Sequence, residues 1–265
     1  MTTLAAVLDE LTPDEGAFAI EAPPAWSQGR TLYGGITAAL MYEAVRRGSS
    51  DLAPLRSAQF TFVGPAAGRL RFCSSLLRRG RSSTLMAADA VNDAGHVARA
   101  LFAFGATRES KVKHNFLPKP DVPAPDAVAS FRKEGGDAPR GFWNNFETRL
   151  ASGGRLLDAN AKRPEFAVWT RFLDVGGGAD PTTALLALAD CLPPAAMVLF
   201  PEFGPISTMT WTVDIAHIPQ RLDGWFLLWA ASEQAGDGYS LQNMAMWDGA
   251  GALIATGRQT IAIFV

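Results

Sequence analysis

The fold of this chain is indicated by a pattern that occurs twice, SSTLMAADAVNDAGHVA at residues 82–98 and GYSLQNMAMWDGAGALIA at residues 238–255. Each copy predicts a strand, a turn rich in Asp and Gly, and a second strand. Each copy also follows another long predicted strand and lies downstream of an apolar helix. We infer a tandem duplication of one helix-plus-sheet unit. The two copies need not stay equivalent, because one can keep the catalytic side chains while the other supplies the walls of a binding site and hydrogen-bond donors.

The composition limits the classes of protein to which the chain can belong. Its 265 residues are 48% hydrophobic and 19% charged, which is typical of a globular protein with one large domain or two ordinary ones. The net charge of −2 does not indicate binding to nucleic acid or to an anionic membrane. Cys73 and Cys191 are the only cysteines, which excludes a disulfide framework and a cysteine-based zinc site.

The sequence contains no recognisable targeting or membrane-spanning segment. Residues 1–11 are acidic and only weakly apolar, unlike a signal peptide. No apolar run approaches the ~20 residues that span a bilayer. We therefore expect a cytoplasmic protein without a membrane partner.

The first copy is predicted to surround an apolar helix with antiparallel strands. A short amphipathic helix at residues 4–11 and a strand at 17–22 precede Gly34-Gly35, which opens a helix ending at Arg47. This helix is apolar on nearly every side, so we expect a curved sheet around it. Polar turns separate the four strands that follow, which favours an antiparallel meander. These strands are expected at 57–63, 69–79, 82–92 and 96–104.

The second copy repeats this order after a segment rich in proline and charge. Residues 111–140 are interpreted as the linker, and strands are expected at 142–150 and 165–173. Asp180-Pro181 is typical of a helix start and predicts a helix through Asp190, which Pro193-Pro194 ends. The last four strands are expected at 206–216, 225–234, 239–247 and 252–264.

These elements predict an α+β fold, a tandem double hotdog. Two antiparallel sheets are each wrapped around a central helix and joined edge to edge, which covers strand edges that would otherwise be exposed. We expect an N-terminal hotdog at residues 1–108, a linker at 109–140 and a C-terminal hotdog at 141–265.

The sequence offers few residues for nucleophilic or metal chemistry. It has three histidines, none near an obvious nucleophile, and no Gly-x-Ser-x-Gly motif. No His-x-x-x-His or Cys-x-x-Cys pair offers a metal site, so we expect no metal and no cofactor. If the protein is an enzyme, its base is expected to be a carboxylate that acts on water.

Asp190 is the carboxylate best placed for that role. It ends an apolar helical run and precedes Cys191-Leu192, so partial desolvation should raise its pKa. A helix-terminal aspartate that bonds the following proline turn explains the same residue equally well.

Two strands after this helix carry polar side chains. Thr208, Thr210 and Thr212 alternate, and a regular strand would place all three on one face. Gln259 interrupts the last strand and needs a hydrogen-bond partner if it is buried. Threonine is also an ordinary strand residue, and the glutamine can equally face solvent.

Several short motifs occur in the order found in one enzyme family. Tyr33-Gly34-Gly35 precedes an apolar helix, and a strand at 60–63 ends in Gly64-Pro65. Ala189-Asp190, the threonine-bearing segment at 207–210 and the segment at 255–259, which ends in Gln259, follow in the second half. Together these segments resemble the acyl-CoA thioesterase II (TesB-like) family of double-hotdog hydrolases, from about residue 16 to residue 264. Ile36 replaces a common glutamine, and 210–212 reads Thr-Trp-Thr instead of Asp-His-Ser.

The resemblance implies hydrolysis of acyl-CoA thioesters with Asp190, Thr208 and Gln259 as catalytic residues. In this hypothesis the three side chains hold one water, which the carboxylate deprotonates. The backbone N–H groups of Gly34, Gly35 or Ile36, at a helix N-terminus, are candidates for the oxyanion hole. A tight turn explains these glycines equally well.

Substrate contacts are expected from apolar and basic side chains. The acyl tunnel is expected to use Met41, Phe60, Phe62, Trp211 and Trp229, although each can equally be ordinary core. The CoA phosphates are expected at Arg78, Arg79 and Arg81, a cluster that is also common at exposed turns.

Other functions remain open on the sequence alone. A non-catalytic acyl- or acyl-CoA-binding protein with the same double hotdog is the main alternative. A hydratase is less favoured, because no histidine lies in either central helix. An interaction module has no low-complexity or charged segment to support it. Hotdog sheets often associate, so we expect a homodimer of double hotdogs.

Overall fold

The computed structural model describes residues 2–132 and 141–265. Most predicted elements are present with small shifts at their ends. In the N-terminal half they are α1 (Leu4–Glu10), β1 (Thr12–Asp14), β2 (Ala17–Glu21), η1 (Pro24–Trp26), β3 (Ser27–Gln28), β4 (Thr31–Leu32), α2 (Gly34–Arg47), β5 (Leu55–Phe62), β6 (Arg69–Arg79), β7 (Ser83–Asn92) and β8 (Gly95–Gly105). In the C-terminal half they are η2 (Pro125–Ala127), η3 (Phe142–Asn145), β9 (Phe146–Gly153), β10 (Glu165–Phe172), α3 (Pro181–Ala189), η4 (Ala195–Leu199), β11 (Ile206–Ile215), β12 (Phe226–Gly236), β13 (Tyr239–Asp248) and β14 (Leu253–Ile263).

The strands of the two halves form one continuous antiparallel sheet. Its order is β1-β2-β6-β7-β8-β5-β11-β14-β13-β12-β10-β9, and β3 and β4 form a separate small hairpin. The halves meet where β5 pairs with β11, with Phe60 opposite Trp211. We call this pairing the β5–β11 seam. The two sheets expected from the sequence, joined edge to edge, are parts of one continuous sheet in the structure, because backbone hydrogen bonds cross the seam.

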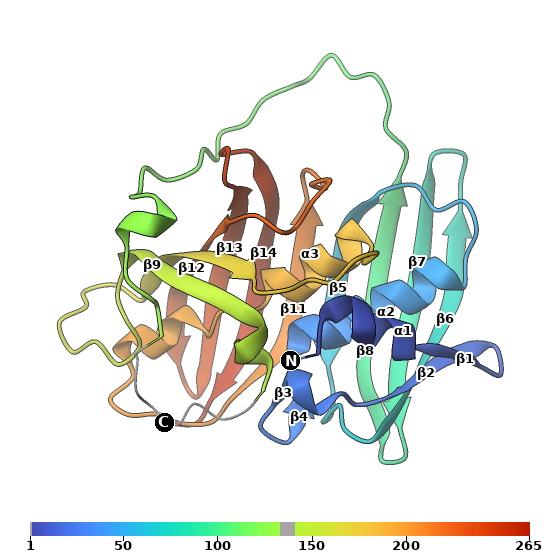
Figure 1. The fold of residues 1–265 in the computed structure, drawn as a ribbon, viewed down its shortest axis with the longest axis horizontal. Helices are drawn as coiled ribbons and strands as arrows, with labels where there is room; N and C mark the ends of the chain where they lie inside the picture. Colours follow the sequence, from blue (N-terminus) through green and yellow to red (C-terminus); the bar gives the residue numbers. More distant parts are fainter. Residues whose placement is uncertain (1, 133–140) are drawn as a thin grey trace.

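Both central helices lie on the same side of this sheet (Figure 1). In α2 every residue from Gly35 to Val45 is buried, and in α3 every residue from Thr182 to Ala189 is buried. Helix α3 begins where the Asp180 carboxylate accepts hydrogen bonds from the N–H groups of Thr182 and Thr183, both at 3.0 Å. The side chains of both helices belong to one large core cluster, as expected for helices that a curved sheet surrounds.

A buried carboxylate connects the two helices. Glu43 of α2 is 1% exposed and accepts hydrogen bonds from Arg46 at 2.7 and 2.9 Å and from Arg47 at 2.6 Å. It also accepts a hydrogen bond from the Thr183 hydroxyl of α3 at 2.8 Å. Burial opposes the charge, but the two guanidinium groups and the hydroxyl outweigh it, so the pKa of Glu43 is lowered.

The N-terminal end of the second half differs from the sequence prediction. The strand expected at 142–150 begins only at Phe146, because Phe142–Asn145 form a turn of 3₁₀-helix. The Asn145 side chain holds this turn by donating a hydrogen bond to the Ala25 carbonyl at 3.0 Å. A turn held by a long-range contact with the first half thus replaces the first residues of the expected strand.

The segment predicted as a linker partly covers the sheet. It leaves β8 in an arch and then reaches the outer face of the C-terminal half (Figure 1). There the indole N–H groups of Trp169 and Trp247 donate hydrogen bonds to the carbonyls of Pro123 at 2.8 Å and Leu117 at 3.1 Å. The end of the predicted linker, residues 133–140, lies outside the described residues. The domain boundaries inferred from the sequence stay a prediction.

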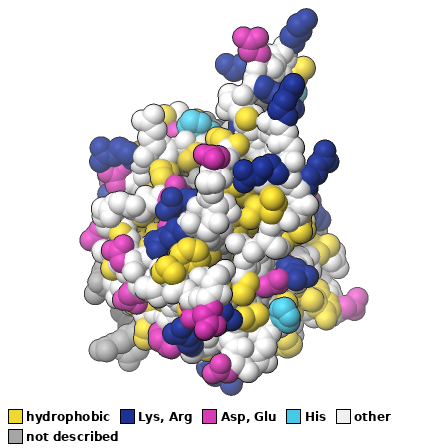
Figure 2. Space-filling view, turned by 90° about the vertical axis from the view of Figure 1, so that its right-hand side faces the viewer, with side chains coloured by type: hydrophobic (Ala, Val, Ile, Leu, Met, Phe, Trp, Pro, Cys, Tyr) yellow, Lys and Arg dark blue, Asp and Glu magenta, His cyan; other side chains and the backbone are white. Residues whose placement is uncertain are grey.

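The corresponding outer face of the N-terminal half is more open. Leu85 and Leu101 on this face are 41% and 43% exposed. The side of the molecule in Figure 2 shows hydrophobic patches among interspersed acidic and basic side chains. None of the described helices combines the length and apolar character that crossing a membrane requires.

Candidate active site

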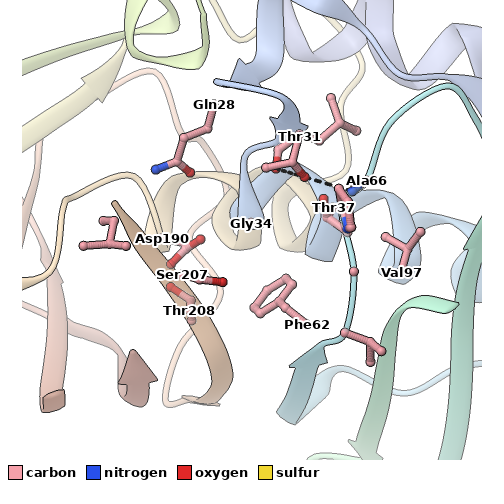
Figure 3. Close-up of a pocket in the computed structure, with 15 residues that line it drawn as sticks. Gln28, Thr31, Gly34, Thr37, Phe62, Ala66, Val97, Asp190, Ser207 and Thr208 are labelled. Atoms are coloured by element: carbon pink, nitrogen blue, oxygen red, sulfur yellow. Dashed lines mark hydrogen bonds between the residues drawn. The ribbon is translucent and has the colours of Figure 1, made fainter. Parts of the chain in front are cut away.

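A cavity of about 380 Å³ opens at one end of the β5–β11 seam. Both halves line it: Gln28, Gly34 and Phe62 come from the N-terminal half, and Asp190, Ser207 and Thr208 come from the C-terminal half. Figure 3 shows the side chains of Asp190, Ser207 and Thr208 close together, facing Phe62 across the cavity. The cavity therefore lies between the N-terminus of α2 and the C-terminus of α3.

Asp190 is placed by the end of α3. It is the C-cap residue, and its backbone N–H bonds the Leu188 carbonyl before the chain turns through Cys191 and Leu192. Its Oδ1 accepts a hydrogen bond from Gln259 Nε2 at 2.5 Å. Its Oδ2 lies so close to Gly34 that a Cβ on this residue would approach it to 2.6 Å. The carboxylate is thus held between the last strand and the first turn of α2.

This environment favours the neutral form of Asp190. Burial raises its pKa to about 7, while hydrogen bonds from Gln259 and from the backbone of Gly35 act in the opposite direction. Among the described residues, no Arg or Lys contributes to the shift, unlike at Glu43. A carboxylate with a pKa near neutrality can both accept and release a proton at physiological pH. The elevated pKa expected from the sequence is present.

Tyr33 fixes the N-terminus of α2 against the end of α3. Its buried hydroxyl donates a hydrogen bond to the carbonyl of Ala187, and its ring stacks on Phe142 at 4.2 Å between centroids. A Cβ on Gly35 would collide with the Tyr33 hydroxyl. Close approach therefore explains the paired glycines, since neither has a positive φ.

Gln259 contacts Asp190 but does not lie among the residues that line the cavity. It is 3% exposed, and its Oε1 accepts a hydrogen bond from Gln242 Nε2 at 2.7 Å. Gln242 Oε1 in turn accepts from the backbone N–H of Ala195 at 2.8 Å. Gln259 is next to Asp190, as expected, but its amide contacts the carboxylate from outside the cavity. Gln242 was not predicted from the sequence, because only the strand register decides that its side chain points inward.

The expectation that three threonines share one face is wrong. A β-bulge at Met209 breaks the alternation of β11, so that Thr208 pairs with Ile261 and Thr210 pairs with Thr260. Thr208 lines the cavity, whereas Thr210 and Thr212 point to the outer face. The neighbouring Ser207 also lines the cavity and was not expected from the sequence.

The three expected oxyanion donors differ in their positions. Gly34 lines the cavity, whereas the backbone N–H of Gly35 is directed to the Asp190 carboxylate. Ile36 is fully buried and does not lie among the cavity residues. Gly34 is therefore the member of this set that faces the space available to a substrate.

The five expected acyl contacts separate into four groups. Phe62 lines the cavity, and Phe60 lies behind it, stacked on Trp211 across the seam at 5.2 Å between centroids. Met41 is fully buried in α2 and does not line this cavity. Trp229 packs with the tryptophan cluster under the linker on the outer face, because it alternates with the inward-facing Leu228 and Ala230.

The structure does not bring the expected arginine cluster to the cavity. Arg78, Arg79 and Arg81 lie at the hairpin between β6 and β7. Through β7 and β8 this hairpin is in register with Leu55, at the start of β5, whereas the cavity adjoins Phe62 at its end. The two ends are about 20 Å apart along the strand.

A different arginine lies beside the cavity. Arg30 is exposed at the tip of the β3–β4 hairpin, whose Gln28 and Thr31 line the cavity. Within residues 2–132 and 141–265, no group of three or more His, Cys, Asp or Glu side chains is placed to hold a metal ion.

Both halves of the chain match models of one protein family. The acyl-CoA thioesterase N-terminal domain matches residues 22–105, and the acyl-CoA thioesterase C-terminal domain matches residues 120–263. Because the second match covers more than half of the chain, the protein belongs to the acyl-CoA thioesterase family, as the sequence motifs indicated. No curated protein sequence is significantly similar to this chain.

Solved structures share the fold over nearly the full length. A conserved protein of unknown function with a hotdog fold from Alicyclobacillus acidocaldarius is 25% identical, with a TM-score of 0.85 over 97% of this chain and 98% of its own. The tesB protein of Mycobacterium avium subsp. paratuberculosis is 17% identical, with a TM-score of 0.80 over 99% and 98%. The acyl-CoA thioesterase II TesB2 of Mycobacterium marinum is 18% identical, with a TM-score of 0.76 over 97% and 96%. The fold is therefore a hotdog fold.

Proposed function

We propose that this protein hydrolyses acyl-CoA thioesters to a free acid and CoA, with Asp190 as the general base. One observation carries the proposal: a carboxylate with a pKa of about 7 lines a cavity beside a threonine hydroxyl and a helix N-terminus. The family to which the chain belongs supports the substrate class.

In the proposed reaction, Asp190 removes a proton from a water that the Thr208 hydroxyl directs toward the thioester carbonyl. The water oxygen bonds to the carbonyl carbon, the C–S bond then breaks, and the CoA thiolate receives a proton from Asp190. Gln259 holds Asp190 Oδ1 and the Gly35 N–H also bonds the carboxylate, which leaves further acceptor positions for the water. General-base help of this kind contributes about 10²–10⁴ in rate, equivalent to roughly 3–5 kcal/mol.

The N-terminus of α2 is the proposed site of oxyanion stabilisation. The first N–H groups of a helix lack partners within the helix and carry a partial positive charge. Gly34 is the residue of this turn that faces the cavity, so its N–H is assigned to the developing oxyanion. Base and oxyanion donor would then come from different halves of the duplicated chain.

We also propose contacts for the two ends of the substrate. Phe62, with Phe60 and Trp211 behind it, gives the apolar wall for the start of the acyl chain. Arg30 on the β3–β4 hairpin is the nearest cation along the chain to the cavity residues Gln28 and Thr31, and it is assigned to the CoA phosphates.

A homodimer of double hotdogs is proposed through the open outer face of the N-terminal half. Leu85 and Leu101 lie exposed on this face, whereas the linker covers the equivalent face of the other half. Light scattering should give twice the chain mass for the wild type and a monomer for Leu101→Glu. A wild-type monomer would contradict this part of the proposal.

The cytoplasmic location expected from the sequence stays a prediction.

The test of the proposed function is release of free thiol from a panel of acyl-CoAs that differ in length and branching. Turnover of at least one member, lost in Asp190→Asn, is the expected result. Tight binding of acyl-CoA without any release of CoA would instead support the non-catalytic acyl-CoA-binding alternative and contradict the proposal.

A further inference from the structure

Three hydrogen bonds in series connect Asp190, through two glutamine side chains, to the loop that follows it. The Ala195 N–H donates to Gln242 Oε1 at 2.8 Å, Gln242 Nε2 donates to Gln259 Oε1 at 2.7 Å, and Gln259 Nε2 donates to Asp190 Oδ1 at 2.5 Å. Ala195 follows Asp190 by five residues. These hydrogen bonds therefore join both ends of the loop at residues 190–195 to two neighbouring strands, β13 and β14.

The direction of this series of hydrogen bonds is fixed by its first member. A side-chain amide can turn over and exchange its oxygen for its nitrogen, but a backbone N–H can only donate. Gln242 must therefore present Oε1 to Ala195 and Nε2 to Gln259. Gln259 must then present Oε1 to Gln242 and an N–H to Asp190. A single backbone donor sets the orientation of both amides.

We propose that Gln242 is a positioning residue, which fixes the Gln259 amide so that its N–H always faces the Asp190 carboxylate. The proposal rests on the proposed function for the identity of Asp190 as the base. Gln242 itself touches neither the cavity nor Asp190, since it is 1% exposed on β13, directly opposite Gln259 in the register.

The consequence of losing Gln242 follows from the same geometry. Without the Gln242 Nε2–H, only the charge of Asp190 itself keeps the Gln259 N–H toward the carboxylate, so the amide can more easily turn its oxygen toward Asp190. A carboxylate that faces an amide oxygen loses one of its donors and gains a repulsive neighbour, so its protonated form is favoured. Less of the base is then ionised at neutral pH, and its remaining oxygen is less well aimed.

The other titratable groups next to Asp190 do not interfere with this reasoning. Among the described residues, the charge of Asp190 adds to the effect of burial on Tyr33 before α2 and on Cys191 after α3. Burial raises the pKa of the Tyr33 hydroxyl well above its usual range and also raises the pKa of the Cys191 thiol. Both groups are neutral from pH 5 to pH 9, so a change in this range reports Asp190.

The experiment compares Gln242→Met with a matched control, Ser240→Ala. Methionine has a similar length but cannot bond either partner. Ser240 is fully buried on the same strand, and its hydroxyl contacts the Ser232 hydroxyl at 3.0 Å. A milder variant, Gln242→Asn, keeps the amide but is one methylene too short to reach both partners, and it serves if the methionine variant does not fold.

The pH profile of acyl-CoA hydrolysis is the first readout. In Gln242→Met we expect kcat to fall about tenfold to a hundredfold, KM to change by less than about threefold, and the pH of half-maximal activity to rise by about one unit. Gln242→Asn should shift the same way by less. An unchanged pH profile in the Gln242 variants, or the same shift in Ser240→Ala, would overturn the proposal.

A second readout does not depend on turnover. The carboxyl carbon of Asp190, assigned by its loss from the spectrum of Asp190→Asn, is titrated by NMR in each protein. Its midpoint should rise in the Gln242 variants and stay at the wild-type value in Ser240→Ala. If the wild type hydrolyses no thioester, the proposed function fails, but this titration still decides the role of Gln242. Equal midpoints in all proteins would contradict that role.

Discussion

Glu43 in the N-terminal half and Asp190 in the C-terminal half are both carboxylates beside the two central helices, and their surroundings have opposite effects. Glu43 is bonded to two arginines and a hydroxyl, and its pKa is lowered. Asp190 is bonded to a neutral amide, and burial raises its pKa to about 7. Two arginines keep Glu43 charged, whereas no cation of the described residues shifts the pKa of Asp190, which can exchange a proton near neutral pH.

This difference shows how a duplicated unit can divide its tasks. In the first half, the buried acid holds α2 to α3 through Thr183. In the second half, the acid lies at a helix end that opens to the cavity. Charge pairing, rather than burial alone, separates a structural carboxylate from a candidate base.

The largest effect should come from exchanging each carboxylate for its amide. Asp190→Asn keeps the shape but cannot accept a proton, so kcat is expected to fall about 10²–10⁴-fold. Glu43→Gln should leave kcat per folded molecule within about threefold, because Glu43 does not line the cavity. Thiol-release assays on folded protein check both values. Equal losses in the two variants would remove the distinction drawn here.

A glycine variant tests the close approach at the N-terminus of α2. Gly34→Ala would place a Cβ 2.6 Å from Asp190 Oδ2, so the carboxylate must move and kcat should fall about tenfold or more. Gly177→Ala is the matched control, because a Cβ there meets nothing within 4 Å and its φ is not positive. If both alanine variants keep wild-type kcat, the packing of Gly34 on Asp190 is not important for turnover.

The pH dependence of activity should follow Asp190. Its pKa of about 7 predicts that kcat/KM rises tenfold per pH unit below this value and is constant above it. The ionised form is the base, so activity is lost as the pH falls. A rate profile with its midpoint near pH 4 would show that Asp190 in the free enzyme has an ordinary pKa.

The two carboxylates should also give opposite slopes in stability against pH. The raised pKa of Asp190 means that the folded state binds more protons than the unfolded chain, so the free energy of unfolding falls as the pH rises from about 4 to 7. Asp190→Asn should remove this loss and be more stable at pH 8 by on the order of 2–4 kcal/mol.

Glu43 acts in the other direction. Its lowered pKa gives stability that is present above its usual value and is lost as the pH falls below it. Glu43→Gln should therefore unfold more easily at pH 8, by about 1–3 kcal/mol. Chemical denaturation between pH 3 and pH 8 measures both slopes. The same sign for both variants at pH 8 would contradict this account.

The smallest effect is expected at the edge of the cavity. Arg30→Ala should raise KM for acyl-CoA about two- to tenfold with little change in kcat, because an exposed arginine contributes little to binding. The effect should fade at high salt. Arg78→Ala at the remote hairpin is the control and should leave KM unchanged, whereas the reverse result would return the phosphate site to the cluster predicted from sequence.

The repeated strand pattern and the glycine and proline positions predicted nearly all elements of the fold. Asp190 was recognisable because an acid at the end of an apolar helix is unusual. The bulge at Met209 was not, since one extra residue leaves the sequence pattern unchanged while reversing the faces of Thr210 and Thr212. Gln242 was missed for a related reason, because register alone decides whether a strand glutamine faces inward.

Long-range packing accounts for the remaining differences. The sequence suggested Trp229 as part of an acyl tunnel, but in the structure the proline-rich segment covers its face of the sheet. The sequence suggested a phosphate site at Arg78, Arg79 and Arg81. Their distance from the cavity depends on the pairing of four strands, which the sequence does not show.

The β5–β11 seam makes the cavity a property of the joined chain. Neither half alone brings the start of α2 to the end of α3, so a fragment could complete its own helix and strands and still present no reaction centre. Catalytic competence would thus report successful union of the halves, and a chain cut in the arch after β8 would behave as a complementation pair, silent apart and active when reassembled.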